Sequence, residues 1–132
     1  MHASHSHNAM PALGMGTFRL LDDVAYQSVK LALKLGYRHI DTAQIYGNEA
    51  EVGRAIKDSG IPRDELFITT KVWNDRQGRD ETRRAVDESL ARIGVDAVDL
   101  MLIHWPCPAE DRYLDTWKTL IDLRAEGRVT SI

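Results

Sequence analysis

Four ionisable residues of different chemistry lie at or near the ends of short apolar segments in this 132-residue chain. Asp41 ends the segment YRHID, Lys71 ends LFITTK and His104 ends VDLMLIH, while Tyr46 follows Asp41 by five residues. Taken singly, each could be an ordinary residue: a loop carboxylate, a solvated lysine or a histidine satisfied within its loop. Their shared position after successive segments favours one common site, because loops that follow strands often carry function.

These four side chains suit proton transfer to a carbonyl oxygen. A carboxylate beside Lys71 stabilises its ammonium form, and a fixed ammonium beside a phenol stabilises the phenolate. Tyr46 could then donate a proton to a developing alkoxide, a step that typically contributes about 10²–10⁴-fold. His104 could hydrogen-bond the same oxygen. None of these groups can supply an electron pair to carbon, so the chemistry requires a reductant such as a nicotinamide cofactor.

The segments that carry these residues recur about every thirty residues. Each is short and rich in apolar or β-branched residues, which predicts strands at residues 37–41, 66–71, 98–104 and 128–132. The run LMLI, apolar at successive positions, indicates a strand covered on both faces. Strands separated by helices at this spacing predict a parallel sheet with right-handed crossovers.

Four helices are predicted between these strands. They span residues 22–34, 48–60, 78–93 (beginning at Gly78 or Asp80) and 114–126. Asp22 or Asp23 could cap the first helix, and Asn48 with Glu51 has capping-box spacing at the start of the second. In the fourth helix one face is expected to be buried and the other solvated; the buried face consists of Trp117, Leu120, Ile121 and Arg124.

Two architectures fit this alternation, a doubly wound open sheet and a (β/α)8 barrel. Dinucleotide binding on an open sheet normally requires G-x-G-x-x-G after the first strand. In GMGTFR, Gly14 and Gly16 are present, but Arg19 stands at the third glycine position. This favours the barrel, of which four to five strands are about half. Half a barrel leaves two apolar edges unpaired, so we expect a longer chain or a partner that closes the sheet.

Composition narrows the functional classes. The net charge of -3 and pI near 5.9 predict no nucleic-acid partner, and no apolar run approaches the roughly 20 residues that span a membrane. The start lacks a secretory signal and Cys107 is the single cysteine, which predicts a cytoplasmic protein with an inert loop thiol. Residues 1–10 are expected to form a disordered or tag-like tail, with no metal site despite its histidines: His2, His5 and His7.

Four motifs in this sequence resemble those of the aldo-keto reductases. They keep the family's order and spacing: LGMGTF (13–18), GYRHIDTAQIYGNE (36–49), ITTKVW (68–73) and VDLMLIHWP (98–106). The similarity covers nearly all of residues 11–132, and the bacterial 2,5-diketo-D-gluconic acid reductases of the compact B type are particularly similar. It implies a (β/α)8 TIM barrel, of which residues 11–132 supply roughly the first half, from the first strand to the start of the fifth.

The resemblance also implies roles for individual residues. Tyr46 matches the proton donor, Lys71 and Asp41 match the pair that tunes it, and His104 matches the residue that orients the substrate. The family's loop that touches the nicotinamide half of NADPH falls on Gly16 and Thr17, and Asp41 also approaches the cofactor ribose.

Three aromatic residues match the family's apolar substrate pocket, although each could equally be ordinary packing: Phe18, Trp73 and Trp105. The implied function is an NADPH-dependent oxidoreductase that reduces aldehyde and ketone carbonyls to alcohols by hydride transfer. Small-molecule substrates such as 2-oxoaldehydes and keto-sugar acids suit such a pocket.

The resemblance leaves two readings open. Relatives continue beyond these residues into a Ser-Asn pair that grips the nicotinamide carboxamide and into residues that bind the adenosine 2′-phosphate. We therefore expect residues 1–132 alone to be inactive and a full-length enzyme to be a monomer. The alternative is a non-catalytic, truncated or half-barrel protein that self-associates or binds a partner through its open sheet edges. The four residues do not exclude it, because relatives that serve as binding subunits keep them too.

Overall fold

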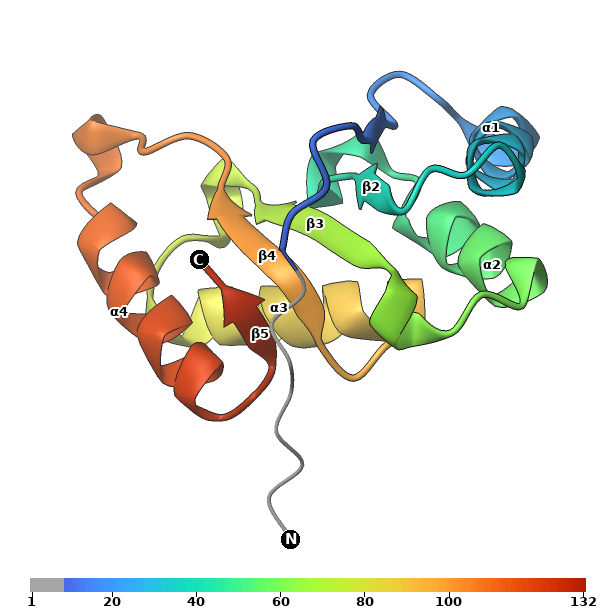
Figure 1. Ribbon diagram of the computed structural model, residues 1–132. Helices are drawn as coiled ribbons and strands as arrows, with labels where there is room; N and C mark the ends of the chain where they lie inside the picture. Colours follow the sequence, from blue (N-terminus) through green and yellow to red (C-terminus); the bar gives the residue numbers. More distant parts are fainter. Residues whose placement is uncertain (1–8) are drawn as a thin grey trace, which may run out of the picture.

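A five-stranded parallel sheet with four helices around its outside makes up the molecule in the computed structural model, which describes residues 9–132 (Figure 1). Its strands are β1 (Met15–Gly16), β2 (His39–Asp41), β3 (Phe67–Val72), β4 (Val98–Ile103) and β5 (Val129–Ser131). The helices are α1 (Asp22–Lys34), α2 (Glu49–Ser59), α3 (Arg79–Ile93) and α4 (Tyr113–Ala125). Short 3-10 helices occupy the loops: η1 (Gln44–Tyr46), η2 (Arg63–Glu65), η3 (Asn74–Arg76) and η4 (Pro108–Glu110).

The strand order separates the two predicted architectures. The strands follow one another as β1-β2-β3-β4-β5, and every neighbouring pair is parallel. A doubly wound sheet would reverse its order at a switch point, whereas a barrel adds strands sequentially. The half-barrel prediction is therefore confirmed. Within the described residues β1 and β5 each pair on one side only, so both are edge strands.

The hydrophobic core lies between the sheet and the helices. Each of the three central strands contributes a fully buried residue: Ile40, Ile68 and Met101. Opposite them pack side chains from every helix, among them Val29, Val52, Val86 and Leu120. Burying one such side chain contributes about 1.5–3 kcal/mol. Leu100 and Leu102 alternate with Met101 and are only partly buried, so the LMLI strand is well covered on its helix side alone.

The predicted N-cap was correct for α3, correct in position only for α2, and wrong for α1. The N-cap of α1 is Leu21, while Asp22 and Asp23 lie in the first turn. Carboxylates at this position interact favourably with the positive end of the helix dipole. Asn48 is the N-cap residue of α2, but its side chain makes no capping hydrogen bond because it binds other loops. Gly78 is the N-cap of α3, one of the two residues predicted.

Helix α4 buries a different face from the one predicted. Leu120 is buried as expected, but Trp117 and Ile121 are exposed. The buried set is Thr116, Thr119, Leu120 and Leu123. Threonine can be buried here because its hydroxyl bonds the carbonyl four residues earlier, as Thr119 Oγ1 does to Asp115 O at 2.8 Å. A prediction based on side-chain size alone therefore chose the wrong buried face of α4.

Two expectations concern membrane spans and the N-terminal tail. Among residues 9–132, no helix is both long and apolar enough to cross a membrane. The predicted tail and its three histidines fall outside the described residues, apart from Ala9 and Met10, which are exposed and irregular. The boundary at residue 11 stays a prediction.

Candidate active site

The sheet brings the four predicted ionisable residues to one edge. Asp41 is the last residue of β2, Lys71 is the penultimate residue of β3, and His104 directly follows β4. Because neighbouring parallel strands end at the same edge, these three side chains become neighbours. Tyr46 joins them from η1, the 3-10 turn that leaves β2.

Lys71 is the most buried charge of the site. Its Nζ donates hydrogen bonds to the carboxylate of Asp41 and to Thr42 O, the latter at 2.8 Å. The Lys71 side chain is 13% exposed and that of Asp41 is 37% exposed, so the carboxylate also faces solvent. The ammonium lies 5.1 Å from the centroid of the Tyr46 ring, within cation–π range. The ion pair therefore places a fixed positive charge against the phenol.

His104 completes the group. Its ring centroid is 5.9 Å from that of Tyr46, in a T-shaped arrangement. Burial lowers the pKa of His104 below its ordinary value of 6.5, the charge of Lys71 lowers it further, and Asp41 opposes this in part. The imidazole is therefore neutral near pH 7 and keeps one N–H donor. Its Nδ1 is buried without a hydrogen-bond partner among the described residues.

The three predicted pocket aromatics surround the Tyr46–His104 pair. Phe18 packs 5.3 Å from the Tyr46 ring, while Trp73 and Trp105 lie 5.0 and 6.3 Å from His104. Phe18 is 63% exposed and Trp105 is 59% exposed. Large aromatic faces left open around partly buried polar groups form an apolar surface of the kind that lines small-molecule sites.

Gly16 and Thr17, the predicted cofactor loop, face in opposite directions. Thr17 is fully buried, and its hydroxyl donates to Asp41 O at 3.2 Å, so the side chain supports the end of β2. Gly16 is exposed, and a Cβ built on it would meet no atom within 4 Å. Gly16 is the register partner of Asp41, so the open space beside it adjoins the ionisable cluster.

Asn48 has the spacing of a capping box, but in the structure its side chain links two loops of the site. It is fully buried, its Nδ2 donates to Thr17 O (2.8 Å) and Leu20 O (2.9 Å), and its Oδ1 accepts from Thr42 Oγ1 (2.7 Å). Asn48 thus ties the loop after β1 to the loop after β2. Gln44 and Glu49 were also missed; all three lie in the motif DTAQIYGNE, whose density of polar residues was the available signal.

Metal ligands and a cysteine thiol are the other reactive groups to consider in residues 9–132. Between residues 9 and 132 no three His, Cys, Asp or Glu side chains are grouped so that they could hold a metal ion. Cys107, on the same rim, is a partly buried free thiol with a φ of 46°. What the geometry supports is proton donation from a phenol flanked by an ammonium and a neutral imidazole.

Comparison with known proteins adds independent findings. The model of the aldo/keto reductase family matches residues 12–132. Methylglyoxal reductase DkgB of Escherichia coli O157:H7 is 51% identical over 125 residues, which are 94% of this chain and 47% of that protein. The crystal structure of a candidate 2,5-diketo-D-gluconic acid reductase B aligns with a TM-score of 0.87 at 50% identity, over 92% of this chain and 43% of that one.

A more distant structure carries a bound nucleotide. The Bombyx mori aldo-keto reductase AKR2E4, solved in complex with NADP, aligns with a TM-score of 0.84 at 39% identity. The alignment covers 93% of this chain and 46% of the silkworm protein. This chain therefore spans about half the length of the relatives it matches.

Proposed function

Because the chain belongs to the aldo/keto reductase family, we propose that it supplies the proton-donating half of an NADPH-dependent carbonyl reductase. One observation carries the proposal: the Lys71 ammonium, paired with Asp41, lies 5.1 Å from the centroid of the Tyr46 ring, and the neutral His104 ring lies 5.9 Å from the same centroid. A phenol held between these groups is suited to protonate a carbonyl oxygen at neutral pH.

Each residue has a distinct part in the proposed reaction. Tyr46 transfers its hydroxyl proton to the substrate oxygen as that oxygen gains negative charge. Lys71 stabilises the phenolate left behind, and Asp41 holds the ammonium in place through their ion pair. His104 donates a hydrogen bond to the same oxygen and so fixes the orientation of the carbonyl.

The residues present fit the nicotinamide end of NADPH. Gly16 leaves open space beside the cluster, and the Asp41 carboxylate is partly exposed toward solvent. We propose that Gly16, the backbone at Thr17 and Asp41 hold that end of the cofactor; the buried Thr17 side chain acts through the position of Asp41. When bound, NADPH supplies the hydride that the carbonyl carbon requires. The NADP complex of the silkworm relative supports this choice of cofactor.

The proposed substrates are small carbonyl compounds. The E. coli relative is a methylglyoxal reductase, which supports 2-oxoaldehydes, and the relative described as a 2,5-diketo-D-gluconic acid reductase B supports keto-sugar acids. The exposed faces of Phe18 and Trp105 provide apolar contact area for such molecules.

A second candidate is a half-barrel that self-associates. Its support is the exposed apolar surface of α1 and α4, the first and last helices along the sheet. This surface consists of Val24 and Leu31 in α1, Leu35 directly after it, and Leu114, Trp117 and Ile121 in α4. In this alternative a second copy covers these residues and the edge strands. The intact mass of the native protein separates the two candidates. About twice the 14.9 kDa of these 132 residues supports the reductase, while 14.9 kDa in a dimer supports the alternative.

The reductase proposal is tested by Tyr46→Phe in a complete barrel. We define this as residues 1–132 followed by the C-terminal half of E. coli DkgB, the relative of which the chain covers 47%. With methylglyoxal and NADPH, kcat should fall by about 10²–10⁴-fold, because the proton donor is lost. The matched control is Tyr37→Phe, at the start of the β2 segment. Activity near the original level in Tyr46→Phe would remove Tyr46 from the proposed role.

Residues 1–132 alone are expected to be inactive. The same assay on the unextended chain should show no sustained loss of NADPH absorbance. A steady loss proportional to the protein concentration would contradict that expectation and leave the roles of the four residues untouched.

A further inference from the structure

We propose that Gln44 is a positioning residue that holds Tyr46 in place for proton transfer. The inference rests on the proposed function, since it gives Gln44 a role through the proposed proton donor. Tyr46, the central residue of the site, lies in the three-residue turn η1, and this turn must be fixed in position for Tyr46 to act.

The turn η1 contains no fully buried side chain that could fix it to the core. None of its three residues is buried, and Ile45, its only aliphatic side chain, is 49% exposed. Its backbone makes two turn hydrogen bonds, Tyr46 N to Ala43 O (3.1 Å) and Gly47 N to Gln44 O (3.2 Å). These bonds are internal to the turn and do not fix it to the sheet. The aliphatic side chain of η1 therefore does not anchor the turn, and the Tyr46 ring contacts Phe18 and His104, which lie on other loops of the site.

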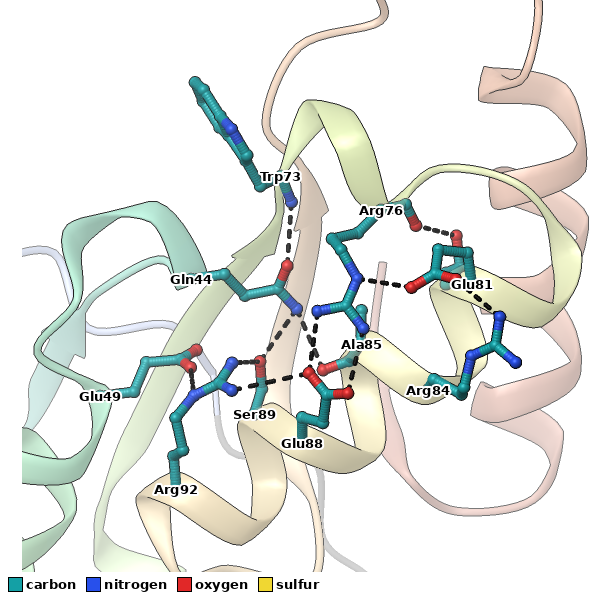
Figure 2. A network of polar contacts seen from close by, with 11 residues as sticks. Gln44, Glu49, Trp73, Arg76, Glu81, Arg84, Ala85, Glu88, Ser89 and Arg92 are labelled. Carbon is teal, nitrogen blue, oxygen red and sulfur yellow. Dashed lines mark hydrogen bonds and ion pairs between the residues drawn. The ribbon is translucent and has the colours of Figure 1, made fainter.

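Gln44 makes the side-chain hydrogen bonds that attach η1 to its surroundings (Figure 2). Its Oε1 accepts from the backbone N–H of Trp73 at 3.0 Å. Its Nε2 donates to Ala85 O at 3.1 Å and to Ser89 Oγ at 3.0 Å. Among the described residues no other side chain of η1 has a hydrogen bond. One amide thus joins the turn to the end of β3 and to the middle of α3.

The groups that receive Gln44 are themselves well fixed. Ala85 and Ser89 are both fully buried in α3. Trp73 follows Lys71 by two residues, and Figure 2 shows its indole pointing away from this network. That indole packs on His104 at 5.0 Å. Gln44 therefore contacts Trp73, which directly follows the strand that carries the ammonium and also packs on the imidazole. Tyr46 lies two positions along the chain from Gln44.

A second tether holds the other end of the turn. Glu49, three residues after Tyr46, is almost fully buried; its Oε1 accepts from Thr70 Oγ1 (2.6 Å) and its Oε2 from Arg92 Nε (2.7 Å). Thr70 precedes Lys71 in β3. Arg92 Nη2 also reaches Ser89 Oγ at 3.4 Å, so the two tethers meet on α3. The segment around Tyr46 is thus fixed to β3 and α3 on both sides.

The effect of loosening one tether follows from the demands of proton transfer. A misplacement of about 1 Å at a reacting group costs on the order of 100-fold in rate. Gln44→Met keeps the length and shape of the side chain while removing all three hydrogen bonds. We therefore expect kcat to fall by about 10- to 100-fold. The KM for NADPH should change less than about twofold, because Asn48 holds the cofactor loop independently.

The experiment is a double-mutant cycle in the complete barrel, with Gln44→Met introduced alone and into Tyr46→Phe. If Gln44 acts through Tyr46, it changes the residual rate of Tyr46→Phe by less than about twofold, because no phenol is left to position. A purely structural role would give the same fold-loss in both backgrounds. The matched control is Gln27→Met on the exposed surface of α1, which should leave kcat unchanged.

A second variant and a second measurement cover the case in which Gln44→Met does not fold. Ser89→Ala removes one of the three hydrogen bonds and should lower kcat by about 2- to 10-fold, again only when Tyr46 is present. In either folded variant, the amide hydrogen of Tyr46 should exchange with deuterium faster than in the parent. Unchanged exchange together with unchanged kcat overturns the inference.

The outcomes also separate this inference from the proposed function. If Tyr46→Phe keeps its activity, the proposed function fails, and the inference fails with it. If Tyr46→Phe loses activity but the fold-loss caused by Gln44→Met is the same with and without Tyr46, only the role of Gln44 is refuted.

Discussion

Helices α2 and α3 approach so closely at Gly53 that any larger residue there should destabilise the fold. A Cβ built on Gly53 would lie 2.1 Å from Ile93 O and 2.6 Å from Ile93 C. Both atoms belong to the backbone at the last residue of α3, so no side-chain rotation can relieve the contact. Gly53→Ala therefore requires the two helices to separate.

The size of the effect follows from two opposing terms. Alanine is favoured over glycine inside a helix by about 1 kcal/mol. Overpacking a tight contact costs about 1–3 kcal/mol, and a clash with rigid backbone belongs at the upper end of that range. The free energy of unfolding should therefore fall by about 2 kcal/mol. With a urea m-value of about 2 kcal/mol/M, the unfolding midpoint moves down by about 1 M.

Urea unfolding of the 132-residue chain, followed by circular dichroism, measures this shift. Gly16→Ala is the matched control, because Gly16 lies outside any helix and a Cβ there meets no atom within 4 Å. Its midpoint should stay close to that of the parent. The reasoning is refuted if Gly53→Ala unfolds at the same or a higher urea concentration than the parent, since the helix-propensity gain would then outweigh the contact.

Two further predictions concern pH and the cofactor. Burial lowers the pKa of both His39 and His104 from 6.5, so the unfolded chain binds protons first as the solution is acidified. The free energy of unfolding should thus be nearly constant from about one unit above pH 6.5 upward and fall as the pH drops through 6.5, by at most about 1.4 kcal/mol per pH unit for each histidine. Urea titrations between pH 7.5 and 5 measure this slope, and His104→Gln should reduce it; an equal slope in that variant contradicts the assignment. Gly16→Val should raise the Kd for NADPH in the complete barrel at least tenfold, or about 1.4 kcal/mol, by filling the open space beside the cluster. Quenching of tryptophan fluorescence reports this Kd, and unchanged affinity would place the nicotinamide elsewhere.

The close contact at Gly53 also affects the position of the site residues. The contact at Gly53 sets the spacing of α2 and α3, and the Glu49–Arg92 ion pair spans the same two helices at 2.7 Å. Gln44 reaches α3 through Ala85 and Ser89. The close helix contact therefore helps to define where the Tyr46 turn lies.

Several features were accessible from the sequence because their causes are local. The strand and helix periods are properties of consecutive residues, and all four predicted strand segments became β-strands within one or two residues. The convergence of Asp41, Lys71 and His104 needed one further rule, that parallel neighbouring strands end at the same edge. The structure brings these three together with Tyr46, as predicted.

Other features depended on partners far away in the chain. Asn48 has the spacing of a helix cap, yet its amide binds Thr17 and Leu20 instead, because the fold offers it buried carbonyls. The side chain of Thr17 is buried and bonds Asp41 O. In α4 the buried face contains Thr116 and Thr119, whereas Trp117 is exposed. Gln44 gave no signal of its own, since its three partners lie 29 to 45 residues away. A polar side chain bonds whichever group the assembled fold presents to it, and that choice is made only when distant elements have packed together.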